Sequence, residues 1–451
     1  MLKKSLLLDL SFASVILIVL SNLNGIANLL FGVTSPFSVF ILVFCLIISY
    51  ALFRYGSVTL PLWAFWTMLA LFFAIGTISW FFYSYTHIKT ADYYKVFRKT
   101  VPAFILTFAV YKYMLYASDR GRMLNVLYFI TFSLLITTFM VPIGALTNIF
   151  SGSFKVLMYG GGGRSAGLFA SPNLAGVHAN FALAFVLFFI VQSKRFSLLF
   201  LLLVPIVLYA SFLTFSKATI IISGFLIVIF FIYHSAIILS IPRARRRRFS
   251  LAILMILLGV IAFFPKIQEL TANLNFQQLQ RLQQIGDLLQ GNVDEATTTD
   301  RSTLWGEAIG LIASQPIQGW GISGLHNLPE GRLGAHNTYL MVWGEAGILP
   351  FIAMMVYIVS AYYRCFFWIR DPSYRFLALS LLFVITIQMY GASHNGLSNS
   401  EAVIMTAIVI ALIQTQRGRI EHLRHGKYLE KDYRYQQSKL ASQNGRLLHN
   451  E

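Results

Sequence analysis

The sequence predicts an all-α polytopic membrane protein with about 12 transmembrane helices and one long extracytoplasmic loop containing amphipathic helices. Hydrophobic residues make up 57% of the 451 residues and only 12% are charged, which is about half the share typical of soluble domains. Apolar runs long enough to cross a hydrocarbon core of about 30 Å recur along the chain. Because every backbone polar group in lipid needs an internal partner, these spans must be helices.

The first apolar run resembles a signal peptide, but no small-residue cleavage site follows it. We therefore expect it to be retained as the first span. Cys45 and Cys365 lie in or beside spans, so no disulfide framework is expected. The spans predicted from the apolar runs are 7–31, 36–54, 59–84, 101–117, 123–143, 173–192, 197–214, 218–240, 249–265, 337–361, 374–391 and 400–416.

Lys and Arg are concentrated in every second loop, and this asymmetry accounts for the formal net charge of +18. The positive-inside rule assigns those loops and both termini to the cytoplasm, and the charge asymmetry is that expected of an inner-membrane protein. The run RARRRR (243–248) joins two spans on this side, so we interpret it as a topology anchor and expect no nucleic-acid partner. The polar segment 417–451 is predicted to be a basic cytoplasmic tail. Segment 85–100 is basic on the outer side, and its aromatic residues suggest a position at the interface.

The long polar segment 266–336 is then an extracytoplasmic loop. Within it, FQQLQRLQQIGDLL (276–289) has apolar residues at every third or fourth position, which predicts an amphipathic helix. RSTLWGEAIGLIASQP (301–316) predicts a second helix, capped by Asp300 or Ser302 and ended by Pro316. Its apolar face would carry Leu304, Trp305, Ala308, Ile309 and Ile312. The two helices either lie on the membrane surface as a lid over a site or are ordinary packing helices.

Cations on the predicted outer side are unexpected, because positive charge is disfavoured there. Arg164 follows four glycines, Lys217 lies in a tight turn, Arg301 begins the second loop helix, and Arg332 follows later in the loop. Arginine pairs well with phosphate oxygens, and glycines let backbone N–H groups approach an anion. The set predicts a diphosphate site at membrane depth. Taken singly, each cation could instead contact lipid headgroups.

Three segments resemble the O-antigen ligase and O-antigen polymerase superfamily. The first is R-S-T-L-W-G-E-A…P-I-Q-G-W-G…H-N-T-Y-L-M-V-W-G-E-A-G-I (301–348). The second, R-S-A-G-L-F-A-S-P-N (164–173), is similar to the family's Arg-x-x-Gly-x-Phe…Pro-Asn segment. The third, F-S-K (215–217), stands where the family usually has Ser-Arg in a short outer turn. Lys217 keeps the positive charge there but lacks the bidentate fork.

The resemblance implies transfer of a glycan from undecaprenyl diphosphate to an acceptor hydroxyl at the outer face of the cytoplasmic membrane. The acceptor is another lipid-linked glycan in polymerases and lipid A-core in ligases, and related members glycosylate proteins. We expect an O-antigen or exopolysaccharide polymerase, with a ligase as the alternative. Residues 1–416 would form the transmembrane glycosyltransferase domain.

The chemistry needs a base for the attacking hydroxyl, and His336 is the candidate. Arg164 and Arg301, with Lys217 assisting, would stabilise the diphosphate leaving group without a metal or other cofactor. Asn337 and Asn173, with Arg332, would position the substrate, although either asparagine could equally be a helix cap. The acidic segment NVDEATTTD contains no Asp-x-Asp pair, and histidines in the outer loops are too scattered for a zinc site.

Four histidines precede an asparagine, and their positions distinguish them. His449 lies in the tail, His394 in a short outer turn, and His326 inside the long loop. Only His336 is expected to join the loop directly to a span at headgroup depth.

Other classes of protein fit less well. A transporter or lipid flippase of twelve spans would show internal repeats and charges in the middle of its spans, whereas here most charges lie at span ends. A structural scaffold would leave the Arg and His residues unexplained.

Overall fold

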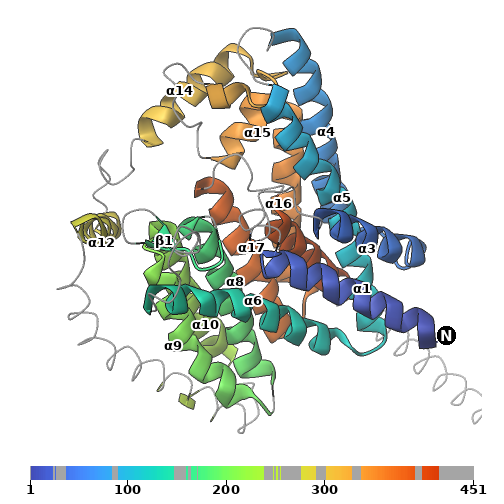
Figure 1. The fold of residues 1–451 in the computed structure, drawn as a ribbon, viewed down its shortest axis with the longest axis vertical. Helices are drawn as coiled ribbons and strands as arrows, with labels where there is room; N and C mark the ends of the chain where they lie inside the picture. The colour runs from blue at the N-terminus through green and yellow to red at the C-terminus, as the bar shows by residue number, and fades with distance from the viewer. Residues whose placement is uncertain are drawn as a thin grey trace, which may run out of the picture.

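The computed structural model is built almost entirely from helices (Figure 1). It describes residues 2–23, 26, 37–83, 90–146, 159–160, 164–169, 171–193, 195–237, 247, 250–251, 254, 276–290, 301–327, 337–391 and 399–415. The elements are α1 (Leu2–Leu20), α3 (Phe37–Ala51), α4 (Leu60–Tyr83), α5 (Thr90–Asp119), α6 (Met123–Leu146), β1 (Tyr159–Gly160), β2 (Arg164–Ser165), α8 (Pro172–Gln192), α9 (Ser197–Leu213), α10 (Lys217–Ile237), α12 (Phe276–Leu289), α14 (Arg301–Ser314), η1 (Gly324–Asn327), α15 (Thr338–Ala346), α16 (Ile348–Trp368) and α17 (Pro372–Gly391). A further helix, Ser400–Thr415, follows.

Seven described helices are long and apolar enough to cross a membrane, which supports the predicted class of helical membrane protein. These are Leu60–Phe82, Thr100–Asp119, Met123–Ile143, Pro172–Gln192, Lys217–His234, Ile348–Trp368 and Pro372–Gly391. Shorter apolar helices are Ser5–Leu20, Phe37–Ala51, Ser197–Leu213 and Ser400–Thr415. Together they fall on all the predicted spans except 249–265, most of which lies outside the described residues. The tail 417–451 and residues 85–89 lie outside them too, whereas 90–100 forms the first part of α5.

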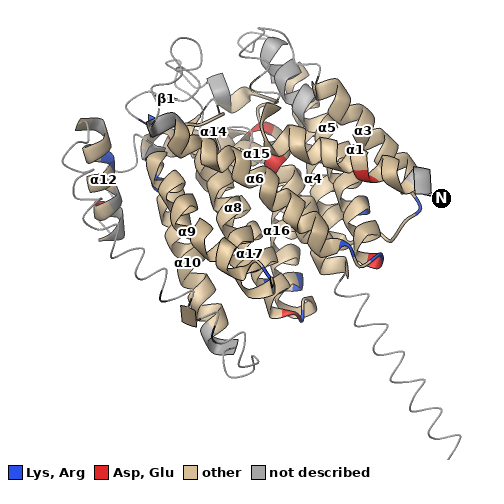
Figure 2. Ribbon diagram, turned by 60° about the horizontal axis from the view of Figure 1, so that its bottom comes forward, with Lys and Arg blue, Asp and Glu red and all other residues tan. Residues whose placement is uncertain are grey.

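Helix α16 illustrates why this bundle suits lipid. One side buries Met354, Tyr357 and Ala361, while Ile352 and Val359 are 49% and 60% exposed. Exposing such a stripe to water would be unfavourable, because each buried methylene contributes about 0.8 kcal/mol. Contact of the same side chains with lipid tails carries no such free-energy cost, because the tails are themselves apolar. Charged residues are accordingly few along the packed helices and occur mostly near their ends (Figure 2).

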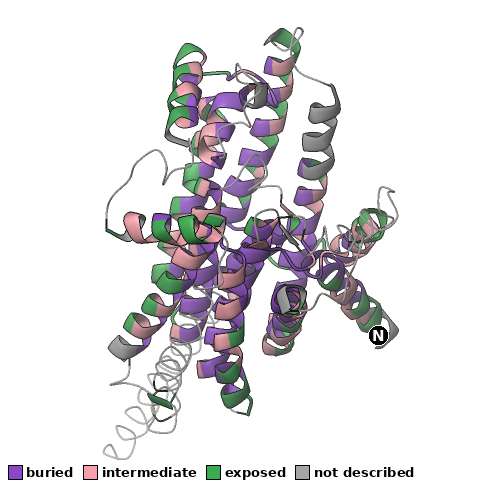
Figure 3. Ribbon diagram, turned by 60° about the vertical axis from the view of Figure 1, so that its left-hand side comes forward, coloured by how far each residue is buried: buried purple, intermediate pink, exposed green. Residues whose placement is uncertain are grey.

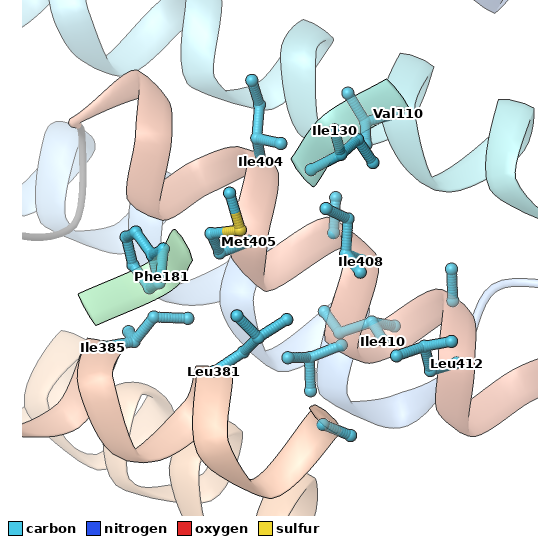
Figure 4. Close-up of a cluster of buried hydrophobic side chains, with 14 of the residues drawn as sticks. Val110, Ile130, Phe181, Leu381, Ile385, Ile404, Met405, Ile408, Ile410 and Leu412 are labelled. Atoms are coloured by element: carbon cyan, nitrogen blue, oxygen red, sulfur yellow. The ribbon is translucent and has the colours of Figure 1, made fainter. Parts of the chain in front are cut away.

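Two helices form the centre of the bundle. Helix α8 packs against α6, α9, α10 and α17, and residues 401–413 of the C-terminal helix are all buried. Figure 4 shows side chains of that helix beside others from α5, α6, α8 and α17, namely Val110, Ile130, Phe181, Leu381 and Ile385. Buried positions follow the middle of the bundle, and exposed ones lie at its periphery (Figure 3).

The predicted span 337–361 is wrong as a single helix. The chain forms the nine-residue α15, breaks at Gly347, and continues as α16. Gly347 has φ of 80°, which a helix cannot contain and which favours glycine. Apolar composition continues across the break, so hydropathy alone could not reveal it. His336 therefore precedes a short helix and not a span.

The two predicted loop helices are confirmed as α12 and α14. In α14, Leu304, Ala308 and Ile312 are buried as predicted, and the helix packs on α15. Ile309 was placed on the same face wrongly, since its side chain is 55% exposed. Its position on the helix lies a quarter-turn from Ala308, at the edge of the stripe.

Candidate functional site

Arg164 lies where three segments of the chain meet. It comes from strand β2, which pairs antiparallel with β1 so that Gly160 opposes Arg164. Its Nε donates to the Thr214 carbonyl oxygen at 2.9 Å, and its Nη2 donates to Asn173 Oδ1 at 2.6 Å. Guanidinium has five N–H groups, so others remain to bind an anion. The side chain is thus fixed between the hairpin, the start of α8 and the turn before α10.

The hairpin itself is held firmly against α6. Ser165 Oγ donates to the Val141 carbonyl oxygen at 2.8 Å, and Phe169 is fully buried. Gly167 has φ of 55°, and a Cβ there would lie 3.0 Å from the Val141 nitrogen. The R-S-A-G-L-F motif therefore fixes the backbone that presents Arg164.

The charge of Arg164 lies in partly desolvated surroundings. Burial, and to a smaller extent the positive charge of Arg281 on α12, lowers the pKa of Arg164 to about 10. The guanidinium still stays protonated at neutral pH. An anion beside it would be bound more strongly than at an open surface, because the local dielectric is lower.

Asn173 is itself a partner of Arg164, and Lys217 lies close in the chain to the other partner, Thr214. Lys217 is the first residue of α10 and follows the tight turn that contains Thr214 and Phe215, the latter with φ of 45°. Asn173 lies in the first turn of α8, which Ser171 caps. The Asn173 side-chain oxygen accepts from Arg164, so its role in the structure is to orient that arginine. These three predicted residues belong to one locality.

Close packing of α8 on α10 holds together the two helix starts that carry Asn173 and Lys217. A Cβ at Gly176 would lie 2.0 Å from Thr219 Oγ1, so only glycine permits this approach. One turn further along both helices, Ser223 Oγ of α10 donates a hydrogen bond to Asn180 Oδ1 of α8 at 2.6 Å. The first turn of α10, which carries Lys217, is therefore held on α8.

A buried pair, His178 and Glu401, was not singled out from the sequence. His178 Nε2 lies 3.4 Å from Glu401 Oε1, and the two side chains are 0% and 7% exposed. Among the described residues, neither ring nitrogen nor Glu401 Oε2 has a hydrogen-bond partner. The pair joins the C-terminal helix to α8 a few residues past Asn173. The rarity of ionisable residues within spans was the signal that could have pointed to it.

Asn337 acts as a helix cap. Its Oδ1 accepts from the backbone N–H groups of Tyr339 and Leu340 at 2.9 and 3.2 Å, which begins α15. The cap interpretation, left open by the sequence, is thus the one that the structure supports. Tyr339 donates to the Thr386 carbonyl oxygen of α17, and α17 also packs on α8.

Glycines of the P-I-Q-G-W-G and W-G-E-A-G segments make a backbone junction. Trp320 and Gly321 N–H donate to the Gly344 and Glu345 carbonyl oxygens at 2.7 and 2.9 Å. A Cβ at Gly321 would lie 2.5 Å from Trp80 Cα in α4. This part of the motif is therefore explained by close packing of the loop on α15 and α4.

Glu345 is buried within this junction, 2% exposed. Burial raises the pKa of Glu345 to about 8, and a hydrogen bond from the Ser323 backbone N–H opposes the rise. Much of the carboxyl population is then neutral at pH 7, which suits a residue enclosed by apolar packing.

Several predicted residues lie outside the described part of the chain. His336 and Arg332 do, as do His394 and His449. Arg301 begins α14 and His326 lies in η1, but their side chains are not described. Within the described residues, no three His, Cys, Asp or Glu side chains gather as metal ligands would. Both cysteines are free and buried, so the expectation of no disulfide is confirmed for this pair.

The fold and the packed helices define a helical membrane protein, and one comparison defines the family that it resembles. Residues 203–355, about a third of the chain, match the family described as O-antigen ligase. The match contains Lys217, Arg301 and His336 but not Arg164. It confirms the resemblance to the O-antigen ligase and polymerase superfamily and supports glycan transfer of that type. No curated protein matches the chain.

Proposed function

We propose that this protein transfers a glycan from undecaprenyl diphosphate to an acceptor hydroxyl, acting as an O-antigen or exopolysaccharide polymerase in the bacterial cytoplasmic membrane. The observation that carries the proposal is the fixed guanidinium of Arg164, bound to Thr214 and Asn173 beside the turn that leads to Lys217. The site would face the exterior, with both termini in the cytoplasm. The family match supports the reaction class.

In the proposed reaction, the acceptor oxygen attacks the anomeric carbon of the lipid-linked glycan. The bond from that carbon to the diphosphate oxygen breaks, and the diphosphate leaves with the bonding electron pair. His336 takes the proton of the attacking hydroxyl. Arg164, Arg301 and Lys217 stabilise the charge that develops on the diphosphate. Arg332 contacts the sugar or its carrier, and the apolar helices accommodate the prenyl chain.

The alternative acceptor is lipid A-core, because the matching family is described as O-antigen ligase. Deleting the gene separates the two activities. Loss of a polymerase leaves single repeats on lipid A-core, whereas loss of a ligase leaves polymer on undecaprenyl diphosphate.

Purified protein in detergent is expected to join lipid-linked glycan to an acceptor in the presence of excess EDTA. Cations supplied by arginine and lysine need no metal ion, so the rate should not change on chelation. The measurement is the appearance of lengthened glycan by gel or mass spectrometry. A transporter would form no lengthened glycan in this assay, because it moves its substrate between compartments and makes no new bond. A complete stop with EDTA that one metal reverses would overturn the arginine-based mechanism.

His336→Ala is expected to lower that transfer rate about 100-fold. This is the lower end of the contribution that a general base makes to a rate, which is about 100- to 10,000-fold. Diphosphate is a good leaving group, so the reaction needs less activation of the attacking hydroxyl. The rate is measured at saturating donor in protein that elutes as wild type does. His326→Ala is the matched control, and near wild-type transfer by His336→Ala would end the role of His336 as base.

A further inference from the structure

Stability alone does not explain why a histidine and a glutamate meet inside the bundle. His178 Nε2 lies 3.4 Å from Glu401 Oε1, and the contact meets the distance for an ion pair but not the geometry of a hydrogen bond. Replacing such a buried pair by apolar residues is often neutral or stabilising, because desolvation of the charges offsets their attraction. Ionisable residues among membrane helices mostly mark function instead. The pair is therefore a candidate for a role in the site.

The His178 ring contacts the motif that presents Arg164. Its centroid lies 4.3 Å from that of the Phe169 ring, which is fully buried. Phe169 is the last residue of the R-S-A-G-L-F motif, and its N–H donates to the Ala166 carbonyl oxygen at 3.0 Å. This hydrogen bond closes the turn that follows β2. The position of the Phe169 ring is thus coupled to backbone only two residues from Arg164.

Helix α8 connects the pair to Arg164 by a second route, because it also carries Asn173, the side-chain partner of that arginine. Residues two apart on a helix differ in direction by about 200°, so His178 and Asn180 lie on opposite sides of α8. Asn180 faces α10, from which it accepts a hydrogen bond, whereas His178 faces the C-terminal helix. The start of α8 is therefore held by α10 on one side and by Glu401 on the other.

We propose that His178 and Glu401 are positioning residues for Arg164. Their contact fixes α8 on the C-terminal helix and supports the Phe169 ring, so that the hairpin holds the Arg164 guanidinium in one orientation. Opposite charges select a single arrangement of two helices, whereas apolar surfaces allow several. Glu401 lies in the first turn of its helix, where the positive end of the helix dipole attracts a carboxylate. The consequence for glycan transfer rests on the proposed function, but the positioning does not.

The test is the rate at which phenylglyoxal, an arginine-specific reagent, modifies Arg164 in full-length protein in detergent, measured by mass spectrometry. We expect Glu401→Gln to raise that rate about tenfold, because a loosened hairpin releases the guanidinium from Thr214 and Asn173. Glycan transfer should fall about tenfold as the cation is displaced from the diphosphate. Glu401→Asp keeps the charge and should have a smaller effect. Phe169→Leu removes the ring between the pair and the hairpin and should reproduce the effect, and it carries the test if Glu401→Gln does not purify.

Two controls separate positioning from general loosening of the bundle. Arg195 is exposed, so it serves as the internal standard, and phenylglyoxal should modify it at the same rate in every variant. Thr406→Val removes a buried hydrogen bond between the C-terminal helix and Tyr357 of α16. This variant should melt at a lower temperature than wild type, while the modification of Arg164 stays unchanged.

Unchanged modification of Arg164 in Glu401→Gln, together with a lower melting temperature, would make the pair a structural contact only and overturn the inference. A rise that Arg195 shares, or that Thr406→Val also produces, would overturn it too, because the whole bundle would then have loosened. Faster modification of Arg164 with unchanged glycan transfer would refute the consequence for transfer. If wild type transfers no glycan while modification of Arg164 still depends on Glu401, the proposed function fails and the positioning stands.

Discussion

Arg164→Ala is expected to lower glycan transfer about 1000-fold in protein that still inserts and purifies normally. The side chain supplies a firmly held cation of the proposed diphosphate site, through its bonds to Thr214 and Asn173. Loss of one preorganised donor to a developing anion typically costs a factor of about 100 to 1000. Arg164 provides a full charge in partly buried surroundings, so the upper end applies. The measurement is the transfer rate by purified protein.

Two variants sharpen this test. Arg164→Lys keeps the charge but lacks the planar fork that reaches both Thr214 and Asn173, so an intermediate loss is expected. Arg195→Ala is the matched control, since Arg195 is exposed and its guanidinium lies over the Phe196 ring. Transfer by Arg164→Ala within threefold of wild type, at an unchanged melting temperature, would refute the diphosphate role.

Gly347→Ala is expected to destabilise the protein by more than about 3 kcal/mol and to reduce the yield of monodisperse protein sharply. A Cβ at Gly347 would lie 1.9 Å from the Ile317 carbonyl oxygen, well inside contact distance. The φ of 80° adds strain for any residue with a side chain. Because backbone fills the space, α15 and α16 would have to separate from the loop. Fluorescence-detected size exclusion after heating measures the effect.

Gly310→Ala is the matched control for that change. Gly310 lies in α14, and a Cβ there would meet no atom within 4 Å. Alanine is favoured over glycine in a helix by about 1 kcal/mol, so this variant should be as stable as wild type or more so. Equal stability of Gly347→Ala and wild type would refute the proposed junction.

Much of the architecture was readable from the sequence, because hydropathy and helical periodicity are local properties. The period of apolar residues predicted α12 over 276–289, and its bounds are confirmed as Phe276–Leu289. The F-S-K segment was predicted to lie in a short turn, and the structure places a turn at Thr214–Phe215, followed by Ser216 and then by Lys217 as the first residue of α10. Apolar runs likewise predicted the helices that pack around α8.

The sequence by itself determined that the chain is a helical membrane protein with a family motif and unusual cations, since each of these depends on neighbouring residues. Only the tertiary structure decided which distant residues meet. Arg164 binds Thr214, and His178 faces Glu401. It also decided that the chain breaks at Gly347, where an Ile317 carbonyl leaves no room for a side chain. Such contacts arise from the packing of segments far apart in the chain, and no local pattern of residue types encodes them.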